Sequence, residues 1–211
     1  MDQHIVITIA RQYGSGGREI GVKLAELLNV KSYDKELITM AAQKSGISID
    51  EISSADEKAT SSLLYTLALG SSAYGNSSAR FNMPLNDKLF VVQSEIIREI
   101  AEREECVIIG RCGDYVLREA PHVMSFFIYS DESSRIKRVA QRHELSEEAA
   151  KDLIAKTDKR RINYYNFYTG RKWGKFDHYS ASINSAVLGI EGTARLIADM
   201  VNQYKEKNEM S

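Results

Sequence analysis

A glycine-rich loop near the N-terminus has the residue types and spacing that suit binding of a phosphate group. It reads Arg11-Gln12-Tyr13-Gly14-Ser15-Gly16-Gly17-Arg18 and follows a short β-branched segment, 5–9. Glycines let backbone N–H groups converge on an anion, and the N-terminus of a following helix attracts the same charge. A tight strand-to-helix turn without a ligand is the competing interpretation. The residues assigned to the phosphate site are Gly14, Ser15, Gly16, Gly17, Arg18 and Glu19.

The loop departs from the common nucleotide-binding patterns. A dinucleotide fingerprint would need a glycine three residues after Gly16, where this chain has Glu19. In the standard P-loop pattern, the first glycine falls on Arg11 and the phosphate-binding lysine falls on Gly17. The hydroxyl residue that would hold magnesium becomes Glu19 or its neighbour. Arg18 is the predicted replacement for the lysine charge, because a guanidinium can bridge two phosphate oxygens; an ordinary surface arginine is the alternative.

Arginines that could neutralise phosphate recur in three later segments. Arg111 follows an apolar segment, although a strand-end arginine paired with a carboxylate would look the same. Arg138 and Arg142 lie one helical turn apart, which equally fits one exposed basic face. Arg160 and Arg161 lie in a later charged run. Arginines converging from separate segments suit phosphoryl transfer, because catalysis there is mainly positioning and neutralisation of charge.

Alternating apolar segments predict the elements that position these groups. Short apolar runs at 5–9, 106–109 and 123–129 indicate buried strands. Helical spacing is found in three apolar stripes: Ile20, Leu24, Leu27 and Leu28; Leu89, Val92, Ile96 and Ile100; Ile190, Ala194, Ile197 and Val201. Strands that alternate with helices predict an α/β fold with a mainly parallel sheet and helices on both faces.

Two polar stretches interrupt this alternation, at 46–87 and 143–179. Both are expected to be insertions above the carboxyl edge of the sheet. The first is rich in serine pairs. The second joins a charged helix to a tyrosine-rich tract, 163–170, for which packing or a subunit contact is favoured over stacking on a base.

Composition limits the class of protein. A chain of 211 residues that is 43% hydrophobic can form one core, so a single domain over 1–211 is expected. The balance of 28 basic against 29 acidic residues gives no field for binding nucleic acid or an anionic membrane. No signal peptide or membrane span is recognisable, which favours a cytoplasmic protein. Cys106 and Cys112 are expected to be buried reduced thiols, and no metal-ligand spacing is seen.

Several segments together resemble the cytidylate kinase-like family. They are Ile7 to Gly21 around the loop, Val107 to Tyr115 in the middle, and Ile183-Asn184-Ser185 with Leu188 to Glu191 near the C-terminus. The resemblance implies a P-loop kinase core with a helical acceptor-binding insertion at 46–87 and an arginine-bearing lid at 143–179. It also implies transfer of the γ-phosphoryl group of ATP, with Mg²⁺, to a nucleoside monophosphate such as CMP. Nucleotide substrates are the expected partners, and a homo-oligomer stays open.

The resemblance also implies roles for individual residues. The implied catalytic residues are Arg18, Arg142, Arg160 and Arg161. Arg138 is expected at the donor base. The implied acceptor-binding residues are Arg111, Asp114 and Lys35, and no protein residue is assigned as a metal ligand. The alternatives are a non-catalytic nucleotide- or anion-binding regulator with a degenerate loop, and a kinase of another small molecule.

Overall fold

The computed structural model describes residues 4–45 and 85–209. The acceptor-binding insertion predicted at 46–87 therefore lies outside the described residues, apart from its last three positions.

A five-stranded parallel sheet forms the centre of the molecule. Its strands are β1 (Val6–Arg11), β2 (Lys31–Tyr33), β3 (Cys106–Ile109), β4 (Val123–Tyr129) and β5 (Ala181–Asn184). Their order is β2-β3-β1-β4-β5. Ile9 of the central strand is in register with Ile109 and Phe126 of its two neighbours. The carboxyl ends of β3, β1 and β4 therefore meet at one edge, where ligands collect on open α/β sheets.

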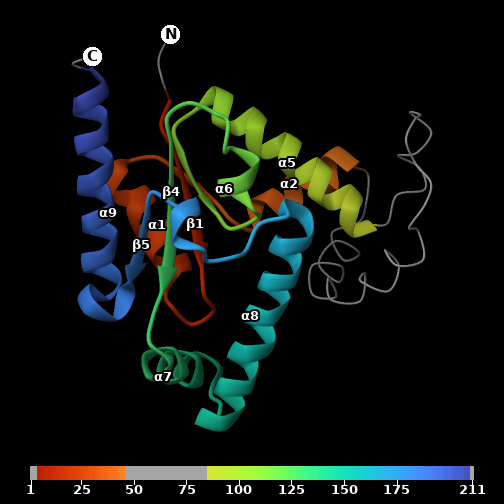
Figure 1. The fold of residues 1–211 in the computed structure, drawn as a ribbon, viewed down its shortest axis with the longest axis vertical. Coiled ribbons are helices and arrows are strands. Elements are labelled where there is room, and N and C mark those ends of the chain that lie inside the picture. The colour runs from red at the N-terminus through yellow and green to blue at the C-terminus, as the bar shows by residue number, and fades with distance from the viewer. Residues whose placement is uncertain (1–3, 46–84, 210–211) are drawn as a thin grey trace.

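Helices cover both faces of the sheet, as predicted (Figure 1). One face is covered by α1 (Gly17–Leu28) and α9 (Ser185–Glu209), and the other by α2 (Glu36–Ser45), α5 (Leu85–Arg103) and α6 (Gly113–Val116). Alternate strand residues point to opposite faces, so Ile7 and Ile9 join the first core while Val6 and Ile108 join the second. This arrangement confirms the predicted α/β class.

The predicted helical stripes are confirmed except at one position. Ile20 and Leu24 are fully buried, but the side chain of Leu27 is 43% exposed. Gly21 and Ala25 complete the buried face of α1 instead. A Cβ atom on Gly21 would lie 2.8 Å from Ile109 Cδ1, so α1 packs closer to the sheet than a large side chain would allow.

Two further helices extend beyond the carboxyl edge of the sheet (Figure 1). They are α7 (Glu132–His143) and α8 (Glu147–Thr169), here called the α7–α8 unit, and a short 3-10 helix, η2 (Phe176–His178), follows. Val139, Ala150 and Ile154 form the apolar contact inside the unit, and Tyr13 of the glycine loop packs against this cluster. The predicted lid region 143–179 thus falls mostly in α8 and the segment after it.

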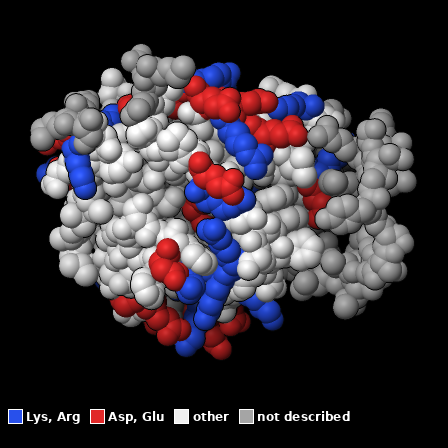
Figure 2. Space-filling view, turned by 45° about the horizontal axis from the view of Figure 1, so that its top comes forward, with Lys and Arg blue, Asp and Glu red and all other residues white. Residues whose placement is uncertain are grey.

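The surface and the cysteines agree with the composition. On the face in Figure 2, basic and acidic side chains lie side by side along one band, as expected from nearly equal numbers of the two charges. Within the described ranges, no helix is long and apolar enough to cross a membrane. Cys106 and Cys112 are free thiols and buried, which confirms their predicted state. Burial raises the pKa of Cys106 to about 12, so it stays a thiol.

Candidate functional site

The glycine loop is held by its own hydrogen bonds between β1 and α1. Gly14 and Gly16 both have φ of 78°, a left-handed conformation that glycine adopts without strain. Ser15 Oγ donates to the carbonyl of Gln12 (2.8 Å) and accepts from the N–H of Gly17 (3.3 Å). Gly16 is the N-cap of α1. The Gly17 N–H is thus taken by Ser15 and the Ile20 N–H by the Gly16 carbonyl, whereas the N–H groups of Arg18 and Glu19 have no intrahelical acceptor by geometry and can bind an anion.

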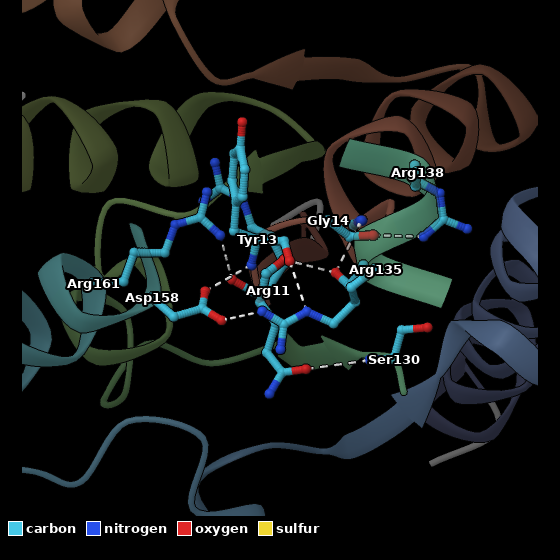
Figure 3. A network of polar contacts seen from close by, with 11 residues as sticks. Arg11, Tyr13, Gly14, Ser130, Arg135, Arg138, Asp158 and Arg161 are labelled. Atoms are coloured by element: carbon cyan, nitrogen blue, oxygen red, sulfur yellow. Dashed lines mark hydrogen bonds and ion pairs between the residues drawn. The ribbon is translucent and has the colours of Figure 1, made fainter. Parts of the chain in front are cut away.

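The α7–α8 unit is tied to the loop by a buried network (Figure 3). The Tyr13 N–H donates to Asp158 Oδ1 (2.7 Å), and the Tyr13 carbonyl accepts from Arg135 Nε (2.8 Å). Arg135 and Asp158 form an ion pair whose side chains are only 10% and 13% exposed. Arg138 Nη1 donates to the Gly14 carbonyl (2.6 Å). The α7–α8 unit therefore makes hydrogen bonds to the loop backbone at two successive residues, Tyr13 and Gly14.

Gly14 is needed for this contact as well as for its backbone angle. A Cβ atom there would lie 2.9 Å from Val139 Cγ2 and 3.1 Å from the Arg135 carbonyl oxygen. Any larger residue would push α7 away from the loop. The glycine pattern therefore serves both the turn and the approach of the α7–α8 unit.

A cavity of about 280 Å³ opens beside the loop at the carboxyl ends of β1 and β3. Its size is near the lower end for ligand pockets, which suits a small molecule. Residues lining the cavity include the arginines Arg11, Arg111, Arg160 and Arg161, the acid Asp114, and the aromatic residues Tyr164, Tyr165 and Trp173. The structure thus brings together four predicted residues, Arg111, Asp114, Arg160 and Arg161.

The two arginines that α8 contributes to the cavity differ in their surroundings. Arg161 Nη1 donates to the Arg11 carbonyl (2.8 Å), and its guanidinium lies 5.5 Å from the centre of the Tyr13 ring. Burial lowers the pKa of Arg161, so its charge is partly desolvated. Arg160 is exposed, and within 4–45 and 85–209 it makes no ion pair. Both cations would be stabilised by an anion in the cavity.

Backbone strain marks the turn after β3. Gly110, Arg111 and Cys112 have φ of 78°, 56° and 53°, so three successive residues are left-handed. Non-glycine residues adopt this conformation at a cost of about 1 kcal/mol or more each. The Gly113 N–H closes the turn by donating to the Gly110 carbonyl (3.0 Å). The strained turn puts Arg111 and Asp114 on the cavity wall.

Asp114 is a buried carboxylate in this wall. It is 7% exposed and accepts a hydrogen bond from Tyr165 Oη (2.6 Å). Burial raises the pKa of Asp114, and the hydrogen bond from Tyr165 opposes that shift. The group is therefore suited to accept a hydrogen bond or a proton from a ligand.

The tyrosine-rich tract forms the C-terminal part of α8 and makes structural contacts, the interpretation that the sequence favoured. Tyr168 Oη donates to Asp87 Oδ1 (2.7 Å), and its ring stacks on Phe90 with 4.5 Å between centroids. Tyr164 and Tyr165 additionally line the cavity.

Other predicted site residues lie outside the cavity. Arg18 Nε donates to Asp34 Oδ2 (2.6 Å), and the Arg18 side chain is 51% exposed. Arg142 pairs with Glu19 across the gap between α7 and α1. Lys35 is exposed after β2 and does not line the cavity. A phosphate contact by Arg18 or Arg142 stays a prediction, because each side chain must first leave its carboxylate.

Sequence reasoning missed Arg11, Asp34 and the Arg135–Asp158 pair. Arg11 had been noted only as a departure from the glycine pattern, yet it lines the cavity. Asp34 follows β2 and is 8% exposed, with Arg11 Nη2 at 3.6 Å and Arg18 Nε at 2.6 Å. A polar residue at the end of a parallel strand or directly after it was the signal that could have found both.

The described residues provide no protein cage for a metal. Within these ranges, no group of three or more His, Cys, Asp or Glu side chains could hold an ion. Asp34 and Glu19, the carboxylates beside the loop, are each bound by arginine. Magnesium in kinase sites is held largely by substrate phosphates and water. The residues present therefore fit an ion that arrives with a nucleotide.

Comparison with known proteins agrees with this geometry. Residues 6–187 match the model of the cytidylate kinase-like family. A search of curated proteins gave no match. Among solved structures, an uncharacterized protein from Eubacterium ventriosum is 30% identical, with a TM-score of 0.65 over 95% of this chain and 98% of that one.

Two shikimate kinases share the fold at low identity. The enzyme from Bacteroides thetaiotaomicron is 12% identical with a TM-score of 0.54, over 94% of this chain and 98% of that one. The enzyme from Acinetobacter baumannii, in complex with shikimate, is 15% identical with a TM-score of 0.50, over 100% and 97%. These likenesses identify a P-loop kinase fold. From the match over most of its length, the chain belongs to the cytidylate kinase-like family.

Proposed function

We propose that the protein is a phosphotransferase that moves the γ-phosphoryl group of ATP to a small anionic acceptor. A nucleoside monophosphate, with CMP as the first candidate, is the acceptor class that the family suggests. The observation that carries the proposal is the set of four arginines around one cavity beside a helix N-terminus. Four arginines around one small cavity suit an anionic ligand, which would add to the charge compensation that Asp114 on the wall and Asp34 beside Arg11 provide.

The donor is proposed to bind along the loop, with its phosphates on the N-terminus of α1. Its base would lie near Arg138 and Ile190, which flank Gly16. A Cβ atom on Gly16 would be 3.1 Å from Ile190 Cγ1 and 3.6 Å from Arg138 Cζ, so both side chains border the loop at this point. An apolar side chain and a guanidinium suit the two faces of a purine. Magnesium would bridge the phosphates and neutralise charge that develops there.

Transfer needs no protein nucleophile. An oxygen of the acceptor attacks the γ-phosphorus, the bond from that phosphorus to the β–γ bridging oxygen breaks, and ADP leaves with the bond's electrons. Arg111 is proposed to orient the acceptor, while Arg160 and Arg161 neutralise the transferring group. Arg142 and Arg18 would join them after leaving Glu19 and Asp34.

A second candidate acceptor is a small anionic molecule with a hydroxyl group. Asp114 favours it, because a carboxylate with a raised pKa on the cavity wall can take the hydroxyl proton as the oxygen attacks the γ-phosphorus. A monophosphate acceptor needs no such base. The two candidates therefore differ in whether Asp114 is required for transfer.

The test is ADP release by the purified protein with ATP and Mg²⁺ across a panel of acceptors. The panel contains CMP, dCMP, UMP, AMP and GMP, together with small hydroxy acids and sugar acids. We expect transfer to one of these classes, dependent on Mg²⁺, and lost in Arg160→Met and Arg161→Met. Arg195→Met is the matched control, because Arg195 is a 69% exposed arginine on α9 that does not line the cavity.

The panel also separates the alternatives. Transfer to a monophosphate that survives Asp114→Asn supports the first candidate, and transfer to a hydroxyl group that Asp114→Asn abolishes supports the second. Tight binding of ATP with no transfer to any acceptor would contradict the enzyme proposal and favour a nucleotide-binding regulator.

A further inference from the structure

We propose that Arg11, at the end of β1, supplies the phosphate-binding charge that a lysine supplies in standard P-loops, and that Gly17 is a glycine because Arg11 occupies its side-chain space. The inference rests on the proposed function, since it assigns a role toward the donor triphosphate. Two departures from the standard P-loop pattern are then linked: Arg11 stands where the pattern has its first glycine, and Gly17 stands where it has the lysine.

The steric half of the exchange is visible at Gly17. A Cβ atom there would lie 2.5 Å from Arg11 Cβ and 3.0 Å from Arg11 Cγ. These atoms are close to the strand backbone and cannot swing away. Gly17 is in α1 and is not among the positive-φ glycines, so its backbone angles do not require glycine. In the interior of a helix, glycine is destabilising relative to alanine. A Cβ atom at Gly17 would also lie 3.2 Å from Ile128 Cβ, but the contacts with Arg11 are shorter, so Arg11 is the main steric reason for Gly17.

The guanidinium end of Arg11 lies against Gly110, the residue that directly follows the neighbouring strand β3. A Cβ atom on Gly110 would be 1.7 Å from Arg11 Nη1, so the guanidinium fills the space of the missing side chain. Gly110 and Arg11 both line the cavity. The Arg11 side chain thus runs from beneath the first turn of α1 to the cavity wall, where a cation can meet both the loop's phosphate and the acceptor.

An ion pair holds the Arg11 side chain, and a backbone contact holds the end of the strand. Asp34 Oδ1 lies 3.6 Å from Arg11 Nη2, and the Arg11 carbonyl accepts from Arg161 Nη1 (2.8 Å). The Arg11 side chain is only 18% exposed. Arg18, another cation beside the loop, is bound to Asp34 at 2.6 Å and half exposed. Arg11 is therefore the better-ordered charge, and an ordered cation binds phosphate at a lower entropic cost than a mobile one.

The test restores the standard pattern step by step. The variants are R11G, R11M, G17A, G17K, R11G/G17A and R11G/G17K, with R195M as the control. Each is measured for thermal unfolding and for calorimetric binding of the magnesium complex of adenosine 5′-(β,γ-imido)triphosphate. Adenosine is the second probe, because it has the base and ribose without phosphate.

We expect R11G and R11M to weaken triphosphate binding by about 10- to 100-fold, the usual range for a hydrogen-bonded charge, with adenosine binding unchanged. G17A and G17K should unfold at lower temperature while Arg11 is present. R11G/G17A should regain stability without affinity. R11G/G17K should regain both, because the lysine then has space and supplies the charge. R11M keeps the apolar stem, so it separates lost charge from lost packing.

Several outcomes would overturn the inference. Triphosphate affinity in R11M within twofold of wild type shows that Arg11 is not the phosphate charge. If G17A and R11G/G17A are equally stable, Arg11 does not exclude a side chain at position 17. If folded wild type does not bind the triphosphate at all, the proposed function fails, and the assigned role of Arg11 fails with it. If wild type and R11M bind the triphosphate equally well, the proposed function is unaffected and only this inference is contradicted.

Discussion

Four cations near the loop are held by identified acceptors. Arg135 is bound by Asp158, Arg18 by Asp34, and Arg138 and Arg161 by backbone carbonyls. Such contacts fix side chains before a ligand arrives, which lowers the cost of gathering them around phosphate. They also impose a cost, because a cation that moves to the ligand leaves its acceptor behind.

Arg18→Ala distinguishes this arginine from Arg11. Arg18 is half exposed and bound to Asp34. Its hydrogen bond to Asp34 raises the pKa of Arg18. We expect Arg18→Ala to weaken triphosphate binding by only about two- to fivefold, as for exposed ion pairs, and far less than Arg11→Gly. Calorimetry on both variants checks the order. A larger loss in Arg18→Ala would instead restore Arg18 as the replacement for the missing lysine.

Asp114→Asn should change how stability depends on pH. Burial raises the pKa of Asp114 in the folded protein. The protonated carboxyl group therefore contributes stability that is fully present below the unfolded pKa, about 3.9, and is lost as pH rises through the native pKa. Asparagine cannot ionise and can still accept from Tyr165. The melting temperature of the variant should thus exceed that of wild type at neutral pH, with the difference shrinking in acid.

The measurement is thermal unfolding of wild type and Asp114→Asn across this pH range. A variant that melts lower at neutral pH would show that the neighbouring arginines stabilise the ionised form. The predicted direction would then be wrong.

Site residues could be predicted where they follow a strand or lie in a charged helix. Arg111, Asp114, Arg160 and Arg161 were expected and meet in one cavity. Arg11 was not, because its role depends on the absence of side chains at Gly17 and Gly110, and sequence spacing does not reveal which atoms fill a glycine's empty space.

At the scale of elements, periodicity predicted the core strands and most of the helix faces. The strands at 106–109 and 123–129 have the expected bounds because they are continuous apolar runs. β5 was not predicted, since Ala181–Asn184 has little apolar character and forms the sheet edge. The exposed Leu27 on α1 was misassigned because small residues, Gly21 and Ala25, make the close contact.

Asp158→Asn should loosen the α7–α8 unit from the loop. Asp158 accepts from the Tyr13 N–H and pairs with Arg135 in a largely buried setting. Removing its charge leaves Arg135 without its counter-ion, and breaking a buried pair costs about 3–5 kcal/mol. We expect faster hydrogen exchange in 11–17 and 132–169, and a lower melting temperature. Asparagine keeps an acceptor for Tyr13, so the loss should lie at the low end of that range.

Asp152→Asn is the matched control for Asp158→Asn. Asp152 is an exposed aspartate on the same helix. Its neutralisation should leave exchange unchanged in both segments. Equal exchange in the two variants would mean that the Asp158–Arg135 pair does not hold the unit on the loop.

At the scale of the whole molecule, the α/β class followed from the sequence because alternation of strands and helices allows few arrangements. The position of the α7–α8 unit did not follow, since it depends on single contacts such as the Arg138 bond to the Gly14 carbonyl. The acceptor-binding role of the insertion at 46–87 and the lid role of 143–179 stay predictions.

Donor and acceptor should stabilise the protein by more than the sum of their separate effects. Arg11 and Arg161 border both the loop and the cavity, so the first ligand to gather them leaves less ordering for the second. One ligand at 100 times its Kd adds about 2.7 kcal/mol, which is roughly 5–11 °C in melting temperature for a domain of this size. Shared arginines should add a coupling of about 1–3 kcal/mol when both are bound.

This coupling can be measured without turnover by using Mg²⁺–ADP as the donor-site ligand and the acceptor found in the panel. Melting curves with each ligand alone and with both, at the same multiples of Kd, give the coupling directly. Arg161→Met should reduce it while Arg195→Met should not, because only Arg161 bonds to the end of β1 and lines the cavity. Strictly additive stabilisation in wild type would mean that the two sites share no ordered element, and the arrangement of arginines would then serve one ligand alone.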